Sequence, residues 1–353
     1  MSFTLTRRSR SGLTVVATLT ALALTATACG SDGGSDSGSG SGSGDGGGGE
    51  DLAITFIPKN LGNPYFDASQ VGGESAAEEF GGTFEQVGPT EATPDSQVSF
   101  INTATQQQAG ALVVSANDPE AIGSALEQAR DIDIPVVTMD SDTNPEYRDV
   151  FVAQADAEGI AQAQVDLVAE QIGDEGEVAI LSAAANATNQ NEWIELMEAE
   201  LEENHPDIEL VDVVYGDDDD QKSFDETAAL LQSNPDLAGI ISPTTVGIAA
   251  AARYLSTSEF QGEVALTGLG TPNQMREYIE DGTVEAFALW NPEELGYLSA
   301  YAASALAAGD ISGEEGDTFT AGDLGEYTVG ADGVVVLGEP TVFDESNIDD
   351  FDF

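Results

Sequence analysis

Short apolar runs alternate with longer amphipathic stretches along the chain from residue 51 onward. This alternation is typical of βα units that form a parallel sheet. The units fall into two successive series, and each series is long enough to build a lobe of its own. The predicted strands lie at residues 53–57, 83–87, 111–115 and 135–139 in the first series, and at 178–181, 210–215, 239–242 and 264–267 in the second. The predicted fold class is therefore α/β, with two doubly wound parallel-sheet lobes joined by a hinge.

The pattern also predicts several crossings of the chain between these lobes. Residues 149–153 lie between the two series, and residues 286–289 precede a helix predicted at 293–307. Strands predicted at 333–337 and 340–343 follow a turn-rich part and return toward the hinge. The expected domains are a first lobe at 51–153 and 290–318, a second lobe at 154–289, and a C-terminal hairpin with a hinge return at 319–353.

Residues 1–28 have the pattern of an export signal. Arg7, Arg8 and Arg10 precede an apolar stretch at 13–24, and small residues follow as far as Ala28. The apolar stretch is short and interrupted by threonine, whereas a membrane span needs about 20 mainly apolar residues. We therefore predict a signal peptide rather than a transmembrane helix.

The only cysteine of the chain, Cys29, follows this segment directly. The junction resembles a bacterial lipobox, in which the cysteine is acylated, although that pattern prefers leucine where this chain has Ala26. The alternative is an ordinary signal peptide with a chance cysteine, but an unpaired thiol is a liability in an oxidising exterior. Residues 29–50, mostly Gly, Ser and Asp, are predicted to be a lipid-anchored flexible tether. The expected localisation is the outer face of the cell membrane, or the periplasm.

The charge of the chain excludes one class of partner. Nine Lys and Arg stand against 65 Asp and Glu, which gives a formal net charge of −56. Nucleic acid is excluded because its phosphates would be repelled. Most acidic residues fall in helix-like segments and are expected to form solvated faces. An excess of this size indicates a saline habitat, where salt screens the self-repulsion.

Polar and aromatic residues gather just after the strands of the first series, where open α/β sheets bind ligands. The loop after the first strand contains Lys59, Asn63 and Phe66. Ammonium and amide groups suit sugar hydroxyls, and an aromatic ring suits the apolar face of a pyranose. The alternative for Tyr65 and Phe66 is that they begin the next helix and pack inward.

Two more candidates follow other strands of the first series. Asn117 follows the third strand and Asp140 the fourth, and a carboxylate can accept hydrogen bonds from two adjacent hydroxyls. Asp118 is better explained as a helix N-cap.

The second series offers a comparable group. Residues 187–193 collect three amides and an indole, and we take Asn189, Gln190 and Trp193 as candidates for ligand binding. Helix capping by Thr188 or Asn189 explains one of these residues but not the cluster.

These segments resemble the sugar-binding proteins of bacterial ABC importers in the ribose-binding family, the type I periplasmic binding proteins. The resemblance extends from about residue 52 to residue 353. Two branches are near, the rhamnose-binding proteins and the receptors for autoinducer-2 (AI-2). The segments that look most like the rhamnose branch lie at 114–119, 186–193, 214–218, 243–247 and 290–292.

The resemblance also implies which residues bind the ligand. The AI-2 receptors use a lysine, two aspartates, a glutamine, a proline backbone and an alanine. The positions that match here are Lys59, Asp140, Gln190 and Pro243, and those that depart are Asn189, for the second aspartate, and Thr245, for the alanine. A lost carboxylate removes a charge-assisted acceptor worth about 1.5–3 kcal/mol. We therefore rank L-rhamnose or a similar deoxyhexose first.

Ribose is disfavoured on the same comparison. The arginines of ribose binders are replaced by Ser141 and Asn189. Their glutamine after the last crossover is replaced by Trp290, which offers a stacking surface for a methyl-bearing sugar.

Other classes of protein lack support in the sequence. No serine stands in a nucleophile elbow, and the single histidine, His205, is expected at the surface. Asp140 and Asp142 would point apart along an extended segment, so they are not expected to form a glycosidase pair. A calcium loop that began at Asp217 would need glycine at its sixth place and glutamate at its twelfth, where this chain has Lys222 and Ala228, so residues 217–220 are interpreted as an acidic, solvated helix start. We expect no enzyme activity, no cofactor and no metal.

The sequence thus predicts a monomeric, exported solute-binding lipoprotein. It is expected to capture a small sugar for the permease subunits of an ABC importer, and L-rhamnose or a similar deoxyhexose ranks first among the candidate sugars. The alternative function is that of an AI-2 receptor for uptake or signalling.

Overall fold

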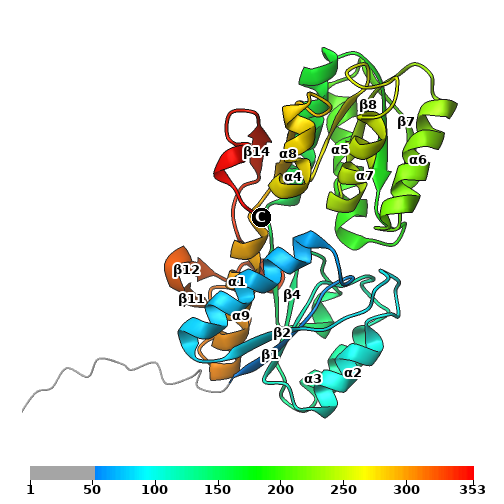
Figure 1. Cartoon of the computed structure of the whole chain (residues 1–353). Helices are drawn as coiled ribbons and strands as arrows, with labels where there is room; N and C mark the ends of the chain where they lie inside the picture. The colour runs from blue at the N-terminus through cyan, green and yellow to red at the C-terminus, as the bar shows by residue number, and fades with distance from the viewer. Residues whose placement is uncertain (1–51) are drawn as a thin grey trace, which may run out of the picture. The chain divides into compact units, whose positions relative to one another are not determined.

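The computed structural model describes residues 52–353, which form two lobes built on two parallel sheets. Cys29, the predicted signal peptide and the predicted tether lie outside the described residues. Figure 1 shows one sheet among the blue and cyan elements and the other among the green and yellow ones. Within residues 52–353, no helix is both long and apolar enough to cross a bilayer.

The first lobe contains a six-stranded sheet in the order β13-β5-β4-β3-β1-β2. Every neighbouring pair in it is parallel. Its strands are β1 (Ala53–Ile57), β2 (Thr83–Gln86), β3 (Ala111–Val114), β4 (Val136–Met139), β5 (Val150–Ala153) and β13 (Val334–Val336). The helices packed on it are α1 (Pro64–Phe80), α2 (Val98–Gln106), α3 (Gly123–Arg130) and α9 (Pro292–Ala308).

Both faces of this sheet are covered, which explains its continuous apolar strands. Leu112 and Val114 of β3 pack with α2 and α3, whereas Val113 between them belongs to the larger core beneath α1 and α9. Successive side chains of a strand point to opposite faces, so one strand supplies both cores.

The second lobe contains a four-stranded parallel sheet in the order β7-β6-β8-β9. Its strands are β6 (Gly176–Ser182), β7 (Ile208–Tyr215), β8 (Leu237–Ser242) and β9 (Ala265–Gly268). Its helices are α4 (Ala157–Ile172), α5 (Thr188–Asn204), α6 (Asp220–Ser233), α7 (Thr245–Leu255) and α8 (Pro272–Glu280). Helix α4 packs beside α5, and α6 beside α7.

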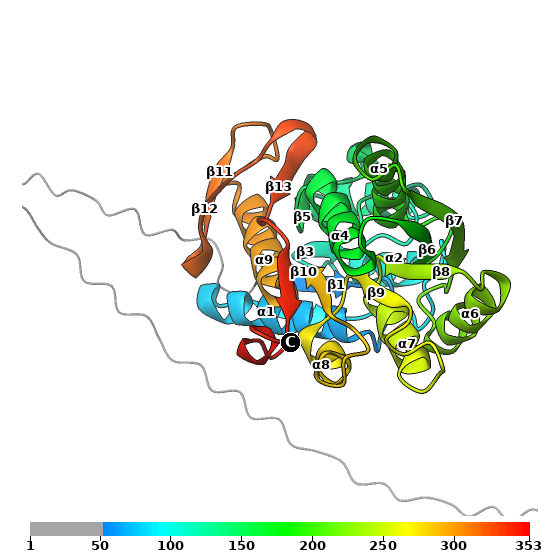
Figure 2. The same ribbon diagram turned by 90° about the horizontal axis from the view of Figure 1, so that it is seen from above.

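The remaining strands form two antiparallel pairs. Strand β10 (Ala286–Leu289) pairs with β14 (Thr341–Asp344), and β11 (Thr318–Ala321) pairs with β12 (Gly325–Thr328). Figure 2 shows β11 and β12 beside α9. The short 3-10 helices are η1 (Pro145–Tyr147), η2 (Gly322–Leu324), η3 (Ala331–Gly333) and η4 (Ile348–Asp350).

The structure confirms the α/β class with parallel sheets and differs from the predicted pattern in three places. Residues 149–153, predicted as a crossing, contain β5 of the first sheet, and the crossing to α4 follows it. The predicted turn-rich part contains the hairpin β11–β12. The two strands that follow do not pair with each other, because β13 joins β5 and β14 joins β10.

Helices α1 and α9 pack unusually closely because glycines face each other's backbone. A Cβ atom on Gly72 of α1 would lie 1.8 Å from the carbonyl oxygen of Glu293, and one on Gly296 of α9 would lie 1.8 Å from that of Ser69. This contact fixes α9, whose N-terminus follows Trp290, against α1, whose first turn contains Tyr65. Two distant segments of the chain thereby meet at one end of the first sheet.

Candidate functional site

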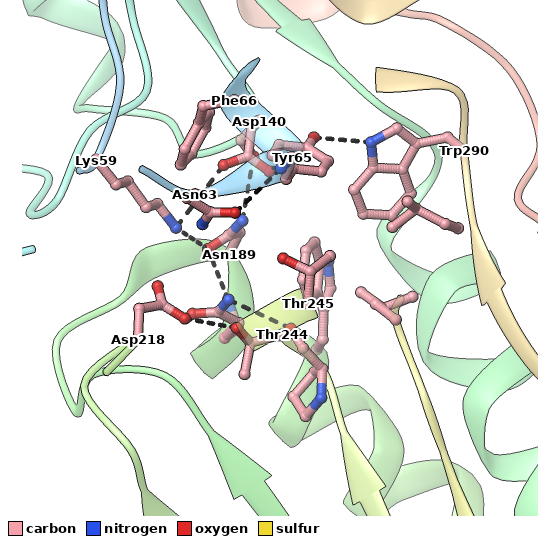
Figure 3. A pocket seen from close by; sticks show the side chains of 15 residues that line it. Lys59, Asn63, Tyr65, Phe66, Asp140, Asn189, Asp218, Thr244, Thr245 and Trp290 are labelled. Carbon is pink, nitrogen blue, oxygen red and sulfur yellow. Dashed lines mark hydrogen bonds and ion pairs between the residues drawn. The ribbon is translucent and has the colours of Figure 1, made fainter. Parts of the chain in front are cut away.

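A cavity lies between the lobes, at the carboxyl ends of both sheets (Figure 3). The residues that line it from the first lobe and the crossing segments are Lys59, Asn63, Tyr65, Phe66, Asp140, Leu289 and Trp290. Those that line it from the second lobe are Asn189, Gln190, Trp193, Asp218, Pro243, Thr244, Thr245 and Leu269. The empty space among these side chains, counted together with the open solvent at the mouth, is about 360 Å³.

Hydrogen bonds connect the two lobes across this cavity. Lys59 Nζ donates to Asn189 Oδ1 over 3.0 Å, and Asn189 Nδ2 donates to the Asp140 carbonyl oxygen over 3.3 Å. Lys59 Nζ also lies 3.8 Å from Asp140 Oδ2, and both side chains are more than nine-tenths buried. A buried ammonium needs such partners, because desolvation penalises an isolated charge.

Asp140 is held by residues of its own lobe. Its carboxylate accepts hydrogen bonds from Ser115 Oγ at 2.8 Å and from Tyr65 Oη at 3.2 Å. Its backbone has φ +63°, in the left-handed region that is uncommon outside glycine. Burial raises the pKa of the Tyr65 hydroxyl well above its ordinary value, and the Asp140 charge raises it further, so Tyr65 remains a donor.

Aromatic rings form the apolar part of the cavity wall. Trp290 Nε1 donates to Tyr65 Oη over 2.8 Å, and the two rings meet edge to face at 6.1 Å. Trp193 from α5 lies 6.0 Å from Trp290 with the rings tilted, and Phe66 packs edge to face on Tyr65. The cavity therefore joins a polar edge to an apolar aromatic surface.

Gln190 presents an unused acceptor in this cavity. Its Nε2 donates to the Pro243 carbonyl oxygen over 3.3 Å, whereas its Oε1 is buried and has no hydrogen-bond partner among the described residues. An unpaired buried polar atom costs free energy, so this oxygen favours a ligand that can donate to it.

The structure places ten of the eleven predicted ligand residues on the cavity wall. The exception is Asn117, which lies behind Lys59 and supports it: Asn117 Nδ2 donates to the Lys59 carbonyl oxygen over 2.9 Å. Its own carbonyl oxygen accepts from Asn186 Nδ2 of the second lobe over 3.0 Å. Asp118, predicted as a helix N-cap, instead caps a turn that precedes α3, by accepting from the amides of Glu120 and Ala121.

Sequence reasoning assigned the cavity too few residues. Tyr65 was not among the predicted ligand residues, because it could also begin a helix and pack inward; it does lie buried in the first turn of α1, and it lines the cavity as well. Thr244 and Asp218 lie in segments that support the family resemblance, but neither was singled out. Leu269 and Leu289 gave no polar signal. The position of Tyr65 directly after Asn63 and Pro64, at a helix start after a strand, is the one available cue.

The prediction that residues 217–220 form a solvated helix start is wrong for Asp218. Asp218 is only partly exposed, lines the cavity and accepts a hydrogen bond from Thr244 Oγ1. Burial raises the pKa of its carboxyl above the ordinary value, against the opposing effect of Lys59. Asp219 does cap α6, by accepting from the Lys222 amide over 2.7 Å.

Carboxylates elsewhere do not form a catalytic pair with Asp140. Asp142 turns away from the cavity and binds the buried Arg148 guanidinium, with distances of 2.8 to 3.1 Å. His205 is half-buried rather than fully at the surface; its Nδ1 lies 2.6 Å from Asp174 Oδ1. Among residues 52–353, one group could hold a metal ion by geometry, formed by Asp166, Glu200 and His205, and it lies apart from the cavity.

The chain matches the family model of the periplasmic binding protein domain over residues 54–311. It therefore belongs to the periplasmic binding protein family, whose members bind solutes for transport and are not enzymes.

The chain is similar to three solved structures of solute-binding proteins over most of its length. A sugar ABC transporter protein of Actinomyces odontolyticus is 53% identical and has a TM-score of 0.70, covering 87% of this chain and 100% of its own. A solute-binding protein of Clostridium phytofermentas, solved with bound L-rhamnose, is 39% identical with a TM-score of 0.82, covering 85% and 98%. LsrB of Clostridium saccharobutylicum, in complex with AI-2, is 26% identical with a TM-score of 0.82, covering 86% and 100%.

Proposed function

We propose that this protein captures a small sugar outside the cytoplasm and delivers it to the permease of an ABC importer. One observation carries the proposal: the cavity between the lobes combines hydroxyl-binding groups with an aromatic wall. Lys59, Asp140 and the unpartnered Gln190 oxygen supply donors and acceptors, and Trp290 supplies the apolar surface. A sugar has both kinds of surface, which a purely polar or purely apolar ligand does not.

Among sugars, L-rhamnose or a similar deoxyhexose is the ligand we favour. The 39% identical protein that was solved with L-rhamnose covers nearly the whole described body. A 6-deoxy sugar carries a methyl group, and the two indole rings of Trp193 and Trp290 provide an apolar surface for it. Its remaining hydroxyls would face Lys59 and Asp140.

AI-2 is the alternative ligand, favoured by the likeness to LsrB. Against it stand two side chains at the cavity wall. Asn189 offers an amide where the AI-2 receptors have a carboxylate, and Thr245 adds bulk and a hydroxyl where they have alanine. Each change alters the hydrogen bonds offered to a compact, hydroxyl-rich ligand.

Ligand binding would act through the population of open and closed forms. The contacts from Lys59 and Asn117 to the second lobe exist only when the lobes are close together. A sugar that touches both lobes binds the closed form more tightly and shifts the population toward it. The permease would recognise the composite surface of that form. We further propose that Cys29 carries a lipid and that the protein acts as a monomer at the membrane.

Calorimetric titration of residues 51–353 at molar salt tests the proposal. L-Rhamnose, D-ribose, D-xylose and AI-2 are compared, with thermal stabilisation by each sugar as a second readout. Tighter binding of L-rhamnose than of the other three ligands supports the ranking of L-rhamnose first. Preferential binding of AI-2 reverses the ranking, and the absence of binding by every sugar rejects the site assignment.

A further inference from the structure

Asp218 lies opposite the residues that the family resemblance assigns to the ligand. It follows β7 in the second lobe, and Figure 3 shows it on the far side of the cavity from Tyr65 and Phe66. Thr244 Oγ1 donates to its Oδ1, which fixes the orientation of the carboxylate. Its second oxygen, Oδ2, has no hydrogen-bond partner within residues 52–353. A carboxylate oxygen that lines a cavity and lacks a partner is suited to accept a hydrogen bond from a ligand.

The charges around the cavity indicate which ligands this oxygen suits. The charged residues on the described cavity wall are Lys59, Asp140 and Asp218, so two carboxylates face a single ammonium. Lys59 is already 3.8 Å from Asp140 and hydrogen-bonded to Asn189. A ligand with a carboxylate of its own would be repelled by the carboxylates of Asp140 and Asp218, and the ammonium of Lys59 is already paired. A neutral hydroxyl, by contrast, can donate a hydrogen bond to either carboxylate.

We propose that Asp218 is a further ligand-binding residue, which accepts a hydrogen bond from a sugar hydroxyl and, together with Asp140, excludes sugar acids. This inference rests on the proposed function and extends it from small sugars to neutral ones. Thr244 is a positioning residue, because it acts on the ligand through Asp218. The exposed neighbour Asp217, which pairs with Lys222, has no such role.

Matched variants test the inference by calorimetry at molar salt. D218N keeps the shape of the side chain but replaces the carboxylate, and D217N is the control one residue away. We expect D218N to weaken binding of the best neutral sugar about 10- to 100-fold, the range for a lost charge-assisted hydrogen bond, and D217N to change it less than about twofold. T244V, which leaves Asp218 in place, is expected to weaken binding by about three- to tenfold.

Two further measurements separate ligand binding from a structural role. D-Galacturonate and D-glucuronate are compared with D-galactose and D-glucose; neither acid should bind the wild type more tightly than its neutral partner. Affinity of the wild type should fall as pH is lowered through the raised pKa of Asp218, and this fall should be smaller in D218N. The charges of Lys59, Asp140 and Asp217 all shift the pKa of Asp218. The pH series therefore includes D217N, which removes one of these charges outside the cavity.

The outcomes distinguish this inference from the proposed function. If the wild type binds no sugar, the proposed function fails and the role of Asp218 fails with it. If the wild type binds a sugar and D218N, folded by circular dichroism, binds it equally well, only the role of Asp218 is overturned. Tighter binding of either sugar acid than of its neutral partner overturns the exclusion.

Discussion

Lys59 of the first lobe donates a hydrogen bond to Asn189 of the second lobe over 3.0 Å, at the wall of the cavity. The same ammonium lies 3.8 Å from Asp140. The Lys59 side chain therefore compensates the charge of Asp140 in its own lobe and is hydrogen-bonded to the other lobe. The closed arrangement depends on this buried cation, and so should the response of the protein to its ligand.

Replacing Lys59 by Met should impair both stability and binding. The change leaves Asp140 buried without its cation, which typically costs about 3–5 kcal/mol; we expect the lower end because Ser115 and Tyr65 still donate to Asp140. Urea unfolding measures the loss, and calorimetry should detect no sugar binding. Lys222→Met is the control, because Lys222 pairs with Asp217 at the surface; it should change the unfolding free energy by less than about 1 kcal/mol. Equal effects of the two variants would contradict the assigned role of Lys59.

Tryptophan fluorescence should report ligand binding directly. The chain has two tryptophans, and both Trp193 and Trp290 line the cavity. A sugar that packs on them changes their exposure and therefore their emission. Trp290→Phe keeps an aromatic ring but removes the donor to Tyr65, and we expect about a 5- to 15-fold weaker affinity from the loss of one buried hydrogen bond. Saturating sugar that leaves the emission unchanged would place the ligand elsewhere.

Gly296→Ala should destabilise the protein although alanine is the better helix former. The new Cβ atom would lie 1.8 Å from the Ser69 carbonyl oxygen, so α1 and α9 must separate, at a cost of about 1–3 kcal/mol. Gly159→Ala is the matched control within α4, where the nearest atom would be 3.7 Å away. That variant should be neutral or more stable by up to about 1 kcal/mol. Thermal unfolding of the two variants side by side checks the prediction, which fails if both shift in the same direction.

Arg148→Lys should be costly despite the retained charge. The buried guanidinium binds both oxygens of Asp142 and donates to the Asp332 carbonyl oxygen over 2.7 Å, which ties the loop after β4 to the segment before β13. An ammonium cannot reproduce this planar set of donors, and we expect a loss of about 2–3 kcal/mol in the unfolding free energy. Arg130→Lys should cost less than about 1 kcal/mol, because Arg130 pairs with Asp149 in a more exposed setting. A similar loss in both variants would contradict this account.

The single histidine should titrate above its ordinary range. The hydrogen bond to Asp174 raises the pKa of His205 above 6.5, with a smaller contribution from Asp166. A raised folded pKa stabilises the fold fully below about pH 6.5, and this contribution disappears as pH rises through the folded value. The gap in unfolding free energy between wild type and His205→Asn should therefore narrow with rising pH. NMR of the one imidazole should show a lower pKa in Asp174→Asn than in Asp166→Asn; the reverse order would contradict the geometry.

The sequence by itself determined the class of the fold and most of the cavity wall. Apolar runs of four to eight residues bounded by polar loops define buried strands, because both faces of a parallel sheet are covered. The cavity residues Lys59 and Asp140 were predictable because they come just after strands, whose carboxyl ends face the cleft by topology, and Gln190 lies in the first turn of α5, which follows β6 after a short loop. These relations are local, so residue order suffices to state them.

Tertiary structure alone decided which neighbours act together. Asp217 and Asp218 have the same chemistry and adjacent positions. Asp217 pairs with Lys222 at the surface, whereas Asp218 lines the cavity and is hydrogen-bonded by Thr244, which lies between β8 and α7. Asn117 likewise became a support for Lys59 rather than part of the wall, and β13 and β14 joined different sheets. Each outcome depends on residues far apart in the chain that meet only when the lobes are folded, and no local pattern of polar and apolar residues records such meetings.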